Sequence, residues 1–286
     1  MLNNFHISSK INVILFGKNG QVASDLIKLF ADKSNFTIHN YSSKDIDFSD
    51  IETLKTKLPI LPKADFIINA TAYNAVDKAE EDSDLANLIN HQAVKEIANY
   101  CQKQNTKFIH YSTNYVFDGN GSELYLEDNT ENLKPLSIYG KSKLNGEKAI
   151  VNSGCDYLIF RLATVFNLTK ENNFVAKIKK LAQTNNELKI VDDQITNPTN
   201  SLDIARATID IIEQITSKNK FTSGIYHLAS QKPISYCEFA KEIIADLKNI
   251  KIIPIPTGYF PTAAQRPLNG ALDVKKIRKD FNINIS

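Results

Sequence analysis

A short apolar segment near the N-terminus, residues 11–16, runs straight into a glycine-containing turn, and an amphipathic helical pattern follows at residues 21–30. A buried strand that passes through a glycine turn into a helix is typical of parallel α/β folds, so few folds remain open. Gly17 and Gly20 let the backbone bend and approach a pyrophosphate, while Ala23 permits close helix packing. We therefore predict a dinucleotide site here, although a packing turn without a ligand would share this motif.

The N-terminal half repeats this alternation of strand and helix patterns. Further strands are predicted at residues 36–41, 64–69, 107–112 and 156–161, and helices at residues 51–58, 85–103 and 135–151. Strands that alternate with helices in this way predict an α/β fold with a Rossmann-type, doubly wound parallel sheet.

The C-terminal half is less regular. Helices are predicted at residues 172–183 and 235–247, strands at 188–191 and 224–229, and a proline-bearing loop at 253–267, and Ser201 is expected to cap a further helix. We predict an NAD(P)-binding Rossmann domain over residues 1–168 and mainly a smaller substrate-binding lobe over residues 169–286. A strand and a helix within about 188–230 are expected to return to the first domain.

Composition narrows the range of partners. The 286 residues include 34 Lys and Arg against 32 Asp and Glu, with no basic block, so neither nucleic acid nor a membrane surface is an expected partner. The three cysteines, Cys101, Cys155 and Cys237, are isolated in sequence and are expected to be reduced thiols. No signal-peptide pattern and no apolar run of membrane-spanning length is present, so we expect a cytoplasmic location.

Tyr139 and Lys143 are the first candidate catalytic pair. Residues four apart lie on one face of a helix, where an ammonium lowers the pKa of a neighbouring phenol and makes it an acid for a carbonyl oxygen. Thr113 ends a predicted strand, where its hydroxyl can point at that carbonyl. A lone Tyr-x-x-x-Lys is common on helix surfaces, but together with the glycine turn these residues predict a carbonyl reductase that uses a nicotinamide dinucleotide.

The end of the second predicted strand favours NADPH as that cofactor. Residues 41–44 offer hydroxyls and the ammonium of Lys44 to a 2′-phosphate, whereas a carboxylate would favour the free ribose of NADH. Because Asp45 and Asp47 follow closely, and Lys44 could equally be a solvated surface charge, NADH stays open as the alternative.

Motifs along almost the whole chain resemble the dTDP-4-dehydrorhamnose reductase family of extended short-chain dehydrogenase/reductases. They lie at residues 15–22, 68–80, 112–119, 139–147, 193–199 and 266–269. The resemblance implies NAD(P)H-dependent reduction of the C4 keto group of a nucleotide-linked 4-keto-6-deoxy sugar, most closely dTDP-4-dehydro-L-rhamnose to dTDP-L-rhamnose. This step belongs to dTDP-rhamnose synthesis, which serves lipopolysaccharide O-antigen formation.

The resemblance also implies roles for individual residues. Tyr139 would be the proton donor, Lys143 its electrostatic partner and Thr113 the carbonyl-orienting hydroxyl. The cofactor would contact Gly17, Asn19, Gly20, Gln21, Val22, Asp47, Phe48, Thr71, Ala72, Tyr73, Tyr139 and Lys143. The nucleotide sugar would contact Thr113, Asn114, Thr164, Gln194, Arg266 and Asn269. For Asp47, a helix cap or a solvated carboxylate is the alternative.

Several residues depart from the family pattern. Asn114 stands where an Asp is frequent, Thr164 where a Trp is frequent beside the sugar, and Asn197 where small residues are favoured. These changes leave the reduction intact but keep open a reductase for a different nucleotide-deoxysugar. A catalytically silent NAD(P)-binding regulatory subunit is the other alternative. Some relatives form magnesium-bridged dimers; Asp25 is suitably placed, yet we expect no metal and leave a homodimer open.

Overall fold

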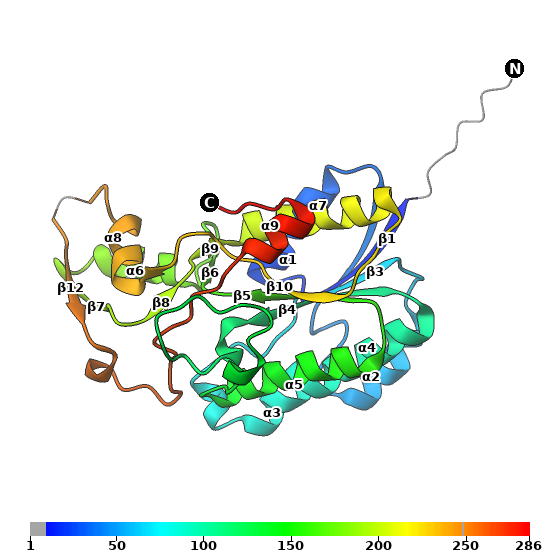
Figure 1. Cartoon of the computed structure of the whole chain (residues 1–286), viewed down its shortest axis with the longest axis horizontal. Coiled ribbons are helices and arrows are strands. Elements are labelled where there is room, and N and C mark those ends of the chain that lie inside the picture. The colour runs from blue at the N-terminus through cyan, green and yellow to red at the C-terminus, as the bar shows by residue number, and fades with distance from the viewer. Residues whose placement is uncertain (1–9, 248) are drawn as a thin grey trace, which may run out of the picture.

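A six-stranded parallel sheet forms the centre of the computed structural model, which describes residues 10–247 and 249–286 (Figure 1). Its strand order is β10-β5-β4-β3-β1-β2. The strands are β1 (Ile11–Phe16), β2 (Phe36–Tyr41), β3 (Phe66–Asn69), β4 (Lys107–Thr113), β5 (Tyr157–Leu162) and β10 (Gly224–His227). The predicted doubly wound Rossmann-type sheet is therefore confirmed.

Helices cover both faces of this sheet (Figure 1). Alternate side chains of β1 point to opposite faces, with Val13 in the core cluster formed with α1 and α7 and Ile14 in the cluster formed with α2 and α4. The helices are α1 (Gln21–Ala31), α7 (Ser201–Lys218) and α9 (Lys275–Phe281) on one face, and α2 (Ile51–Lys57), α3 (Ser83–Asn87), α4 (Ala93–Gln104) and α5 (Ile138–Ser153) on the other.

The strand order reverses at β1, since the chain passes from β1 to β2 on one side and then to β3 on the other. Ligands of open α/β sheets bind beyond the carboxyl ends of the strands at such a switch point. The glycine turn after β1 and the loop after β3 both lie there, so the topology directs the search for a site to this edge.

A smaller lobe lies beyond the carboxyl edge of the sheet (Figure 1). It contains α6 (Phe174–Ala182) and α8 (Tyr236–Ile243) packed on a parallel pair, β7 (Glu187–Val191) and β12 (Lys251–Ile255). Four two-residue strands complete its connections: β6 (Val165–Phe166), β8 (Ile195–Thr196), β9 (Thr199–Asn200) and β11 (Ile234–Ser235). The chain crosses between the parts more than once, because β10 and α7 pack with the large sheet and with α1.

Three local predictions were wrong. Asn200, not Ser201, caps α7, since the Asn200 side chain accepts the amide N–H of Leu202. The helix that follows Ser235 ends at Ile243 rather than near residue 247. Residues 253–255 were predicted as loop because of Pro254, yet they form the end of β12, an edge strand in which a missing amide N–H is tolerated.

Two further features concern the chain as a whole. Cys101, Cys155 and Cys237 are buried and carry free thiols. Within residues 10–247 and 249–286, no helix combines the length and the apolar character that a membrane crossing needs.

Candidate active site

The glycine turn is closed against the loop after β3. Gly17 has a φ of +88°, a conformation that side-chain-bearing residues rarely adopt, and a Cβ there would come within 2.7 Å of the Ala70 carbonyl oxygen. Gly20 precedes α1 and supplies no side-chain cap. The first turn of α1 is therefore left with amide groups that suit an anion.

The N-terminus of α5 is fixed beside the end of β4. The Ser137 side chain caps α5 by accepting the amide N–H of Gly140 at 3.1 Å. Gly140 itself packs so closely on the Tyr115 carbonyl that any side chain there would collide with it. This close approach brings the Tyr139 side chain next to that of Thr113.

A cavity of about 910 Å³ joins these two regions. It brings together nine of the predicted residues: Asn19, Gly20, Gln21, Val22, Thr71, Ala72, Thr113, Tyr139 and Lys143. One end is the glycine turn and the other holds the Tyr, Lys and Thr side chains. The cavity lining therefore extends from the N-terminus of α1 to the side chains of Thr113, Tyr139 and Lys143.

Four predicted cofactor residues lie outside the cavity wall. Gly17 packs behind it, and the ring of Phe48 is buried in the core against Phe16. Asp47 is exposed and accepts the amide and hydroxyl hydrogens of Ser49, which fits the solvated alternative. Tyr73 donates its hydroxyl to Asp82. These four residues lie around the cavity but do not form its wall.

The predicted sugar residues are mostly engaged with the protein itself. The Asn114 amide donates to the Gly270 carbonyl, and the Gln194 amide donates to Thr257. Arg266 forms an ion pair with Asp77 and lies 3.4 Å from the Tyr115 hydroxyl. Asn197, one of the departures from the family pattern, is buried and bonded to Leu272.

Asn269, predicted as a sugar contact, is held by hydrogen bonds to the protein backbone. It is buried, donates its amide to the Glu123 carbonyl and accepts the amide N–H of Ala271. Thr164 holds Tyr236 and Thr196 through its hydroxyl, at 2.6 and 2.9 Å. Of the predicted sugar residues, Thr113 alone lines the large cavity.

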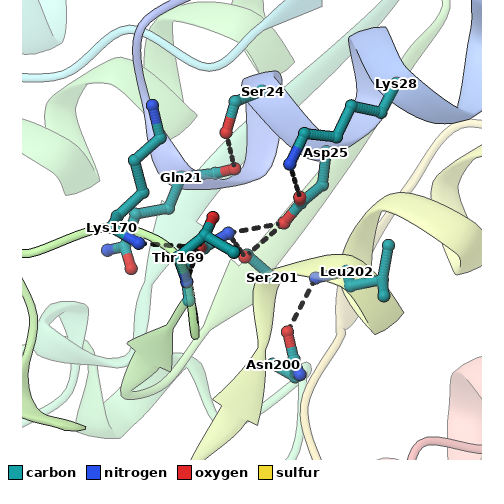
Figure 2. Close-up of polar contacts among 10 residues, drawn as sticks. Gln21, Ser24, Asp25, Lys28, Thr169, Lys170, Asn200, Ser201 and Leu202 are labelled. Atoms are coloured by element: carbon teal, nitrogen blue, oxygen red, sulfur yellow. Dashed lines mark hydrogen bonds and ion pairs between the residues drawn. The ribbon is translucent and has the colours of Figure 1, made fainter. Parts of the chain in front are cut away.

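Sequence reasoning missed a polar loop over the glycine turn. Residues 169–173 line the cavity opposite residues 19–22, and Figure 2 shows Lys170 and Thr169 beside Gln21. This loop follows β5 and β6 at the carboxyl edge of the sheet, so its position along the chain was a usable signal. It adds the Lys170 ammonium to the anion-binding end of the cavity.

Asp25 anchors this loop. Its carboxylate is buried on α1 and accepts hydrogen bonds from Asn167 at 2.8 Å and from Ser201 at 2.6 Å, with the Lys28 ammonium 3.8 Å away (Figure 2). Asn167 in turn accepts the amide N–H groups of Thr169 and Lys170. The carboxylate therefore joins α1, α7 and the cavity loop.

Asn90 is a second missed residue. It lies in a turn of π-helix, η3 (Leu88–Gln92), and its amide accepts the N–H of Tyr73 at 2.8 Å while donating to Ser142 on α5. Single π turns are frequent at functional sites, but nothing in residue pattern marks them in advance. Asn90 fixes the loop after β3 against the helix that carries Tyr139.

Burial dominates the electrostatics of the catalytic pair. It raises the pKa of Tyr139 to about 12, against a lowering effect of the hydrogen bond with Thr113. Burial also lowers the pKa of Lys143 to about 8, against the opposite effect of Glu147. The Tyr139 pKa is therefore raised, and the expectation of a lowered value is wrong for this geometry, in which Lys143 Nζ donates to the Tyr111 carbonyl at 2.7 Å.

This fold and site define a reductase of the extended short-chain dehydrogenase/reductase class. A family model described as the RmlD substrate binding domain matches residues 11–286. The dTDP-4-dehydrorhamnose reductase of Escherichia coli K12 is 36% identical over 281 residues, covering 95% of this chain and 92% of that protein. The chain belongs to the dTDP-4-dehydrorhamnose reductase family, as its motifs predicted.

Solved structures agree with this assignment. A dTDP-4-dehydrorhamnose reductase from Clostridium acetobutylicum matches with a TM-score of 0.86 at 31% identity, covering 94% of this chain and 92% of that one. The Bacillus anthracis enzyme, solved in complex with NADP, matches with a TM-score of 0.87 at 29% identity, covering 96% and 95%. This chain is accordingly an NAD(P)H-dependent oxidoreductase.

Proposed function

We propose that the protein uses NADPH to reduce the C4 carbonyl of dTDP-4-dehydro-L-rhamnose, giving dTDP-L-rhamnose. One observation carries the proposal: a single cavity runs from the glycine turn to Thr113, Tyr139 and Lys143. The family supports the substrate, since its members carry the name of this reaction.

The residues of the cavity fit a dinucleotide. The glycines leave the space that a Cβ would fill, and the Gln21 Oε1 atom is buried without a hydrogen-bond partner in the described part of the chain. We expect Gly20, Gln21 and Val22, with Lys170 opposite, to hold the phosphates, and Thr71 and Ala72 to line the path toward Tyr139. Backbone amides and an ammonium are the groups that phosphates prefer.

Each side chain of the triad has a separate task. Bound NADPH supplies a hydride to the sugar carbon. The Tyr139 hydroxyl donates its proton to the carbonyl oxygen as that oxygen becomes an alkoxide, and Thr113 donates a hydrogen bond that orients the same oxygen. Lys143 stabilises the resulting phenolate until solvent returns the proton.

The nucleotide end of the substrate suits the region between the two parts of the chain. Arg266 lies there half-buried, with its guanidinium ion-paired to Asp77, a partner that a diphosphate could replace. We assign cofactor binding mainly to residues 1–168, with β10 and α7 completing that domain, and substrate binding mainly to residues 169–286.

The direct test is consumption of NADPH with dTDP-4-dehydro-L-rhamnose, followed by NMR of the product. We expect dTDP-L-rhamnose from the native protein and almost none from Tyr139→Phe. Turnover only with another nucleotide sugar would assign the protein a different substrate within the same class of reductases. NADPH binding without turnover of any 4-keto sugar would favour a silent dinucleotide-binding protein.

A further inference from the structure

Lys143 belongs to a buried chain of hydrogen bonds that begins in the loop after β3. The amide N–H of Thr71 donates to Asn69 Oδ1 at 3.0 Å, and Asn69 Nδ2 lies 3.1 Å from His110 Nδ1. The other ring nitrogen, His110 Nε2, lies 3.1 Å from Lys143 Nζ. Asn69, His110 and Lys143 are each almost fully buried, so the protein must satisfy these groups internally.

The direction of each hydrogen bond in this chain follows from the backbone N–H group at its first residue, Thr71. A backbone N–H can only donate, so Thr71 holds the Asn69 oxygen and turns the Asn69 NH₂ group toward His110. Nδ1 of His110 must then accept, which places the proton of a neutral ring on Nε2. Burial and the neighbouring Lys143 hold the pKa of His110 well below its usual range, so the ring is neutral.

This tautomer directs an N–H group at Lys143. An ammonium has no lone pair to accept it, whereas a neutral amine accepts it and still donates to the Tyr111 carbonyl. If the ring instead carried its proton on Nδ1, that N–H would face the Asn69 NH₂ group. Every hydrogen bond in the chain is therefore made only when Lys143 is neutral.

Other charged groups near Lys143 act in both directions. Glu147, one turn further along α5, raises the Lys143 pKa, but Arg161 of β5 binds that carboxylate with a 2.8 Å ion pair. Tyr139 on α5 is neutral because burial raises the pKa of its phenol. From β4, His110 is the group that contacts Nζ with a side chain.

We propose that His110 is a positioning residue that, held in its Nε2–H form by Asn69, presents a donor to Lys143 and disfavours the ammonium. This inference rests on the proposed function for its catalytic meaning, since it concerns the lysine that serves Tyr139. It also links cofactor contact to catalysis, because Thr71, which lines the cavity, fixes the first bond of the chain.

The first experiment reads the tautomer without any turnover. Nitrogen–proton correlation spectra of histidine-labelled protein, with His110 assigned by loss of its signals in His110→Gln, should show a neutral ring protonated at Nε2. In Asn69→Asp the carboxylate accepts from Nδ1–H instead, so the tautomer should reverse. An Nδ1–H ring or a charged ring in the native protein would overturn the proposal.

The second experiment reads the charge of Lys143. The Gln side chain of His110→Gln can turn its oxygen toward the ammonium, so the Lys143 pKa, followed by its side-chain carbon shift, should rise by about half to one unit. NADPH affinity falls at alkaline pH, and the pH at which this fall occurs (the alkaline limb) should rise together with the Lys143 pKa. The same rise is expected in Asn69→Asp. His39→Gln on β2 is the matched control and should leave both unchanged.

The outcomes separate this inference from the assigned reaction. If His110→Gln lowers activity but leaves the Lys143 pKa and the alkaline limb in place, His110 is only a packing residue and the proposal is wrong. If the pKa and tautomer behave as expected while no 4-keto sugar is reduced, the proposed substrate fails and the hydrogen-bond chain stands.

Discussion

The hydroxyl oxygens of Thr164 and Tyr236 lie 2.6 Å apart and join the end of the large sheet to the first residue of α8. The Tyr236 ring packs edge-on against Phe174 at 5.0 Å, so its position is fixed from two sides. Thr164 takes the place where the family resemblance leads us to expect an indole. Tyr236 thus places an aromatic ring next to Thr164, the position at which the expected indole is absent.

We therefore predict that Tyr236→Ala weakens sugar-nucleotide binding. Loss of an aromatic contact worth roughly 1.5–3 kcal/mol would raise the substrate KM about ten- to a hundredfold. The NADPH Kd should hardly change, because Tyr236 does not line the large cavity. Steady-state kinetics beside Tyr259→Ala, an exposed tyrosine of the same lobe, provide the comparison. An unchanged KM would show that Tyr236 does not contact the sugar.

Tyr139→Phe should remove most turnover. Phe keeps the ring but lacks the proton donor, a loss on the order of 10²–10⁴-fold in kcat. Because the Tyr139 pKa is raised to about 12, the phenol stays protonated through the working range, and the alkaline limb of the native enzyme should not come from it. Calorimetry should give an NADPH Kd within a few-fold of the native value. A fall in kcat of less than tenfold contradicts the assignment.

Lys143→Ala should impair both chemistry and cofactor binding. The ammonium serves the phenolate and, in the proposed arrangement, the cofactor ribose, so kcat falls and the NADPH Kd rises together. Lys141→Ala, an exposed lysine on the same helix, is the control for a general loss of charge. Stopped-flow and fluorescence titration measure the two effects separately. An unaltered NADPH Kd would show that Lys143 assists proton transfer from Tyr139 and does not bind the cofactor.

Asp45→Asn should improve the use of NADPH. The Asp45 carboxylate follows β2, accepts both donors of Ser42 and pairs with Lys18 at 3.0 Å. A carboxylate at this strand end repels a 2′-phosphate and occupies the nearest ammonium. We expect a several-fold lower KM for NADPH with little change for NADH. Equal gains for both cofactors would place Asp45 away from the 2′ position.

Glu147→Gln should destabilise the fold rather than alter specificity. Glu147 and Arg161 form a fully buried ion pair, and Ser112 donates to the same carboxylate. Removing one charge from a buried pair costs roughly 3–5 kcal/mol, because the other charge remains unpaired. Urea denaturation measures the loss. Glu52→Gln breaks an exposed pair on α2 and should cost less than about 1 kcal/mol.

The sequence predicted what depends on local geometry. A glycine turn, a strand end and two residues on one helix face placed Gly20, Thr113 and Tyr139 at one cavity, because each motif can be read from nearby residues and parallel strands bring their carboxyl ends to one edge. The sugar residues were harder because their partners are remote: Asn114 bonds to Gly270, which is 156 positions away. Asn269 donates its amide to the carbonyl of Glu123, which is 146 positions away.

Among the strands that the structure describes, β10 pairs with β5 alone, although 61 residues of chain separate the end of β5 at Leu162 from the start of β10 at Gly224. During translation, the outer edge of β5 therefore stays without its neighbour until residues 224–227 have left the ribosome. Open strand edges of this kind pair readily with other chains. A slow or interrupted translation of the lobe between them should make the nascent protein aggregate, even though every residue of the proposed catalytic triad has already been made.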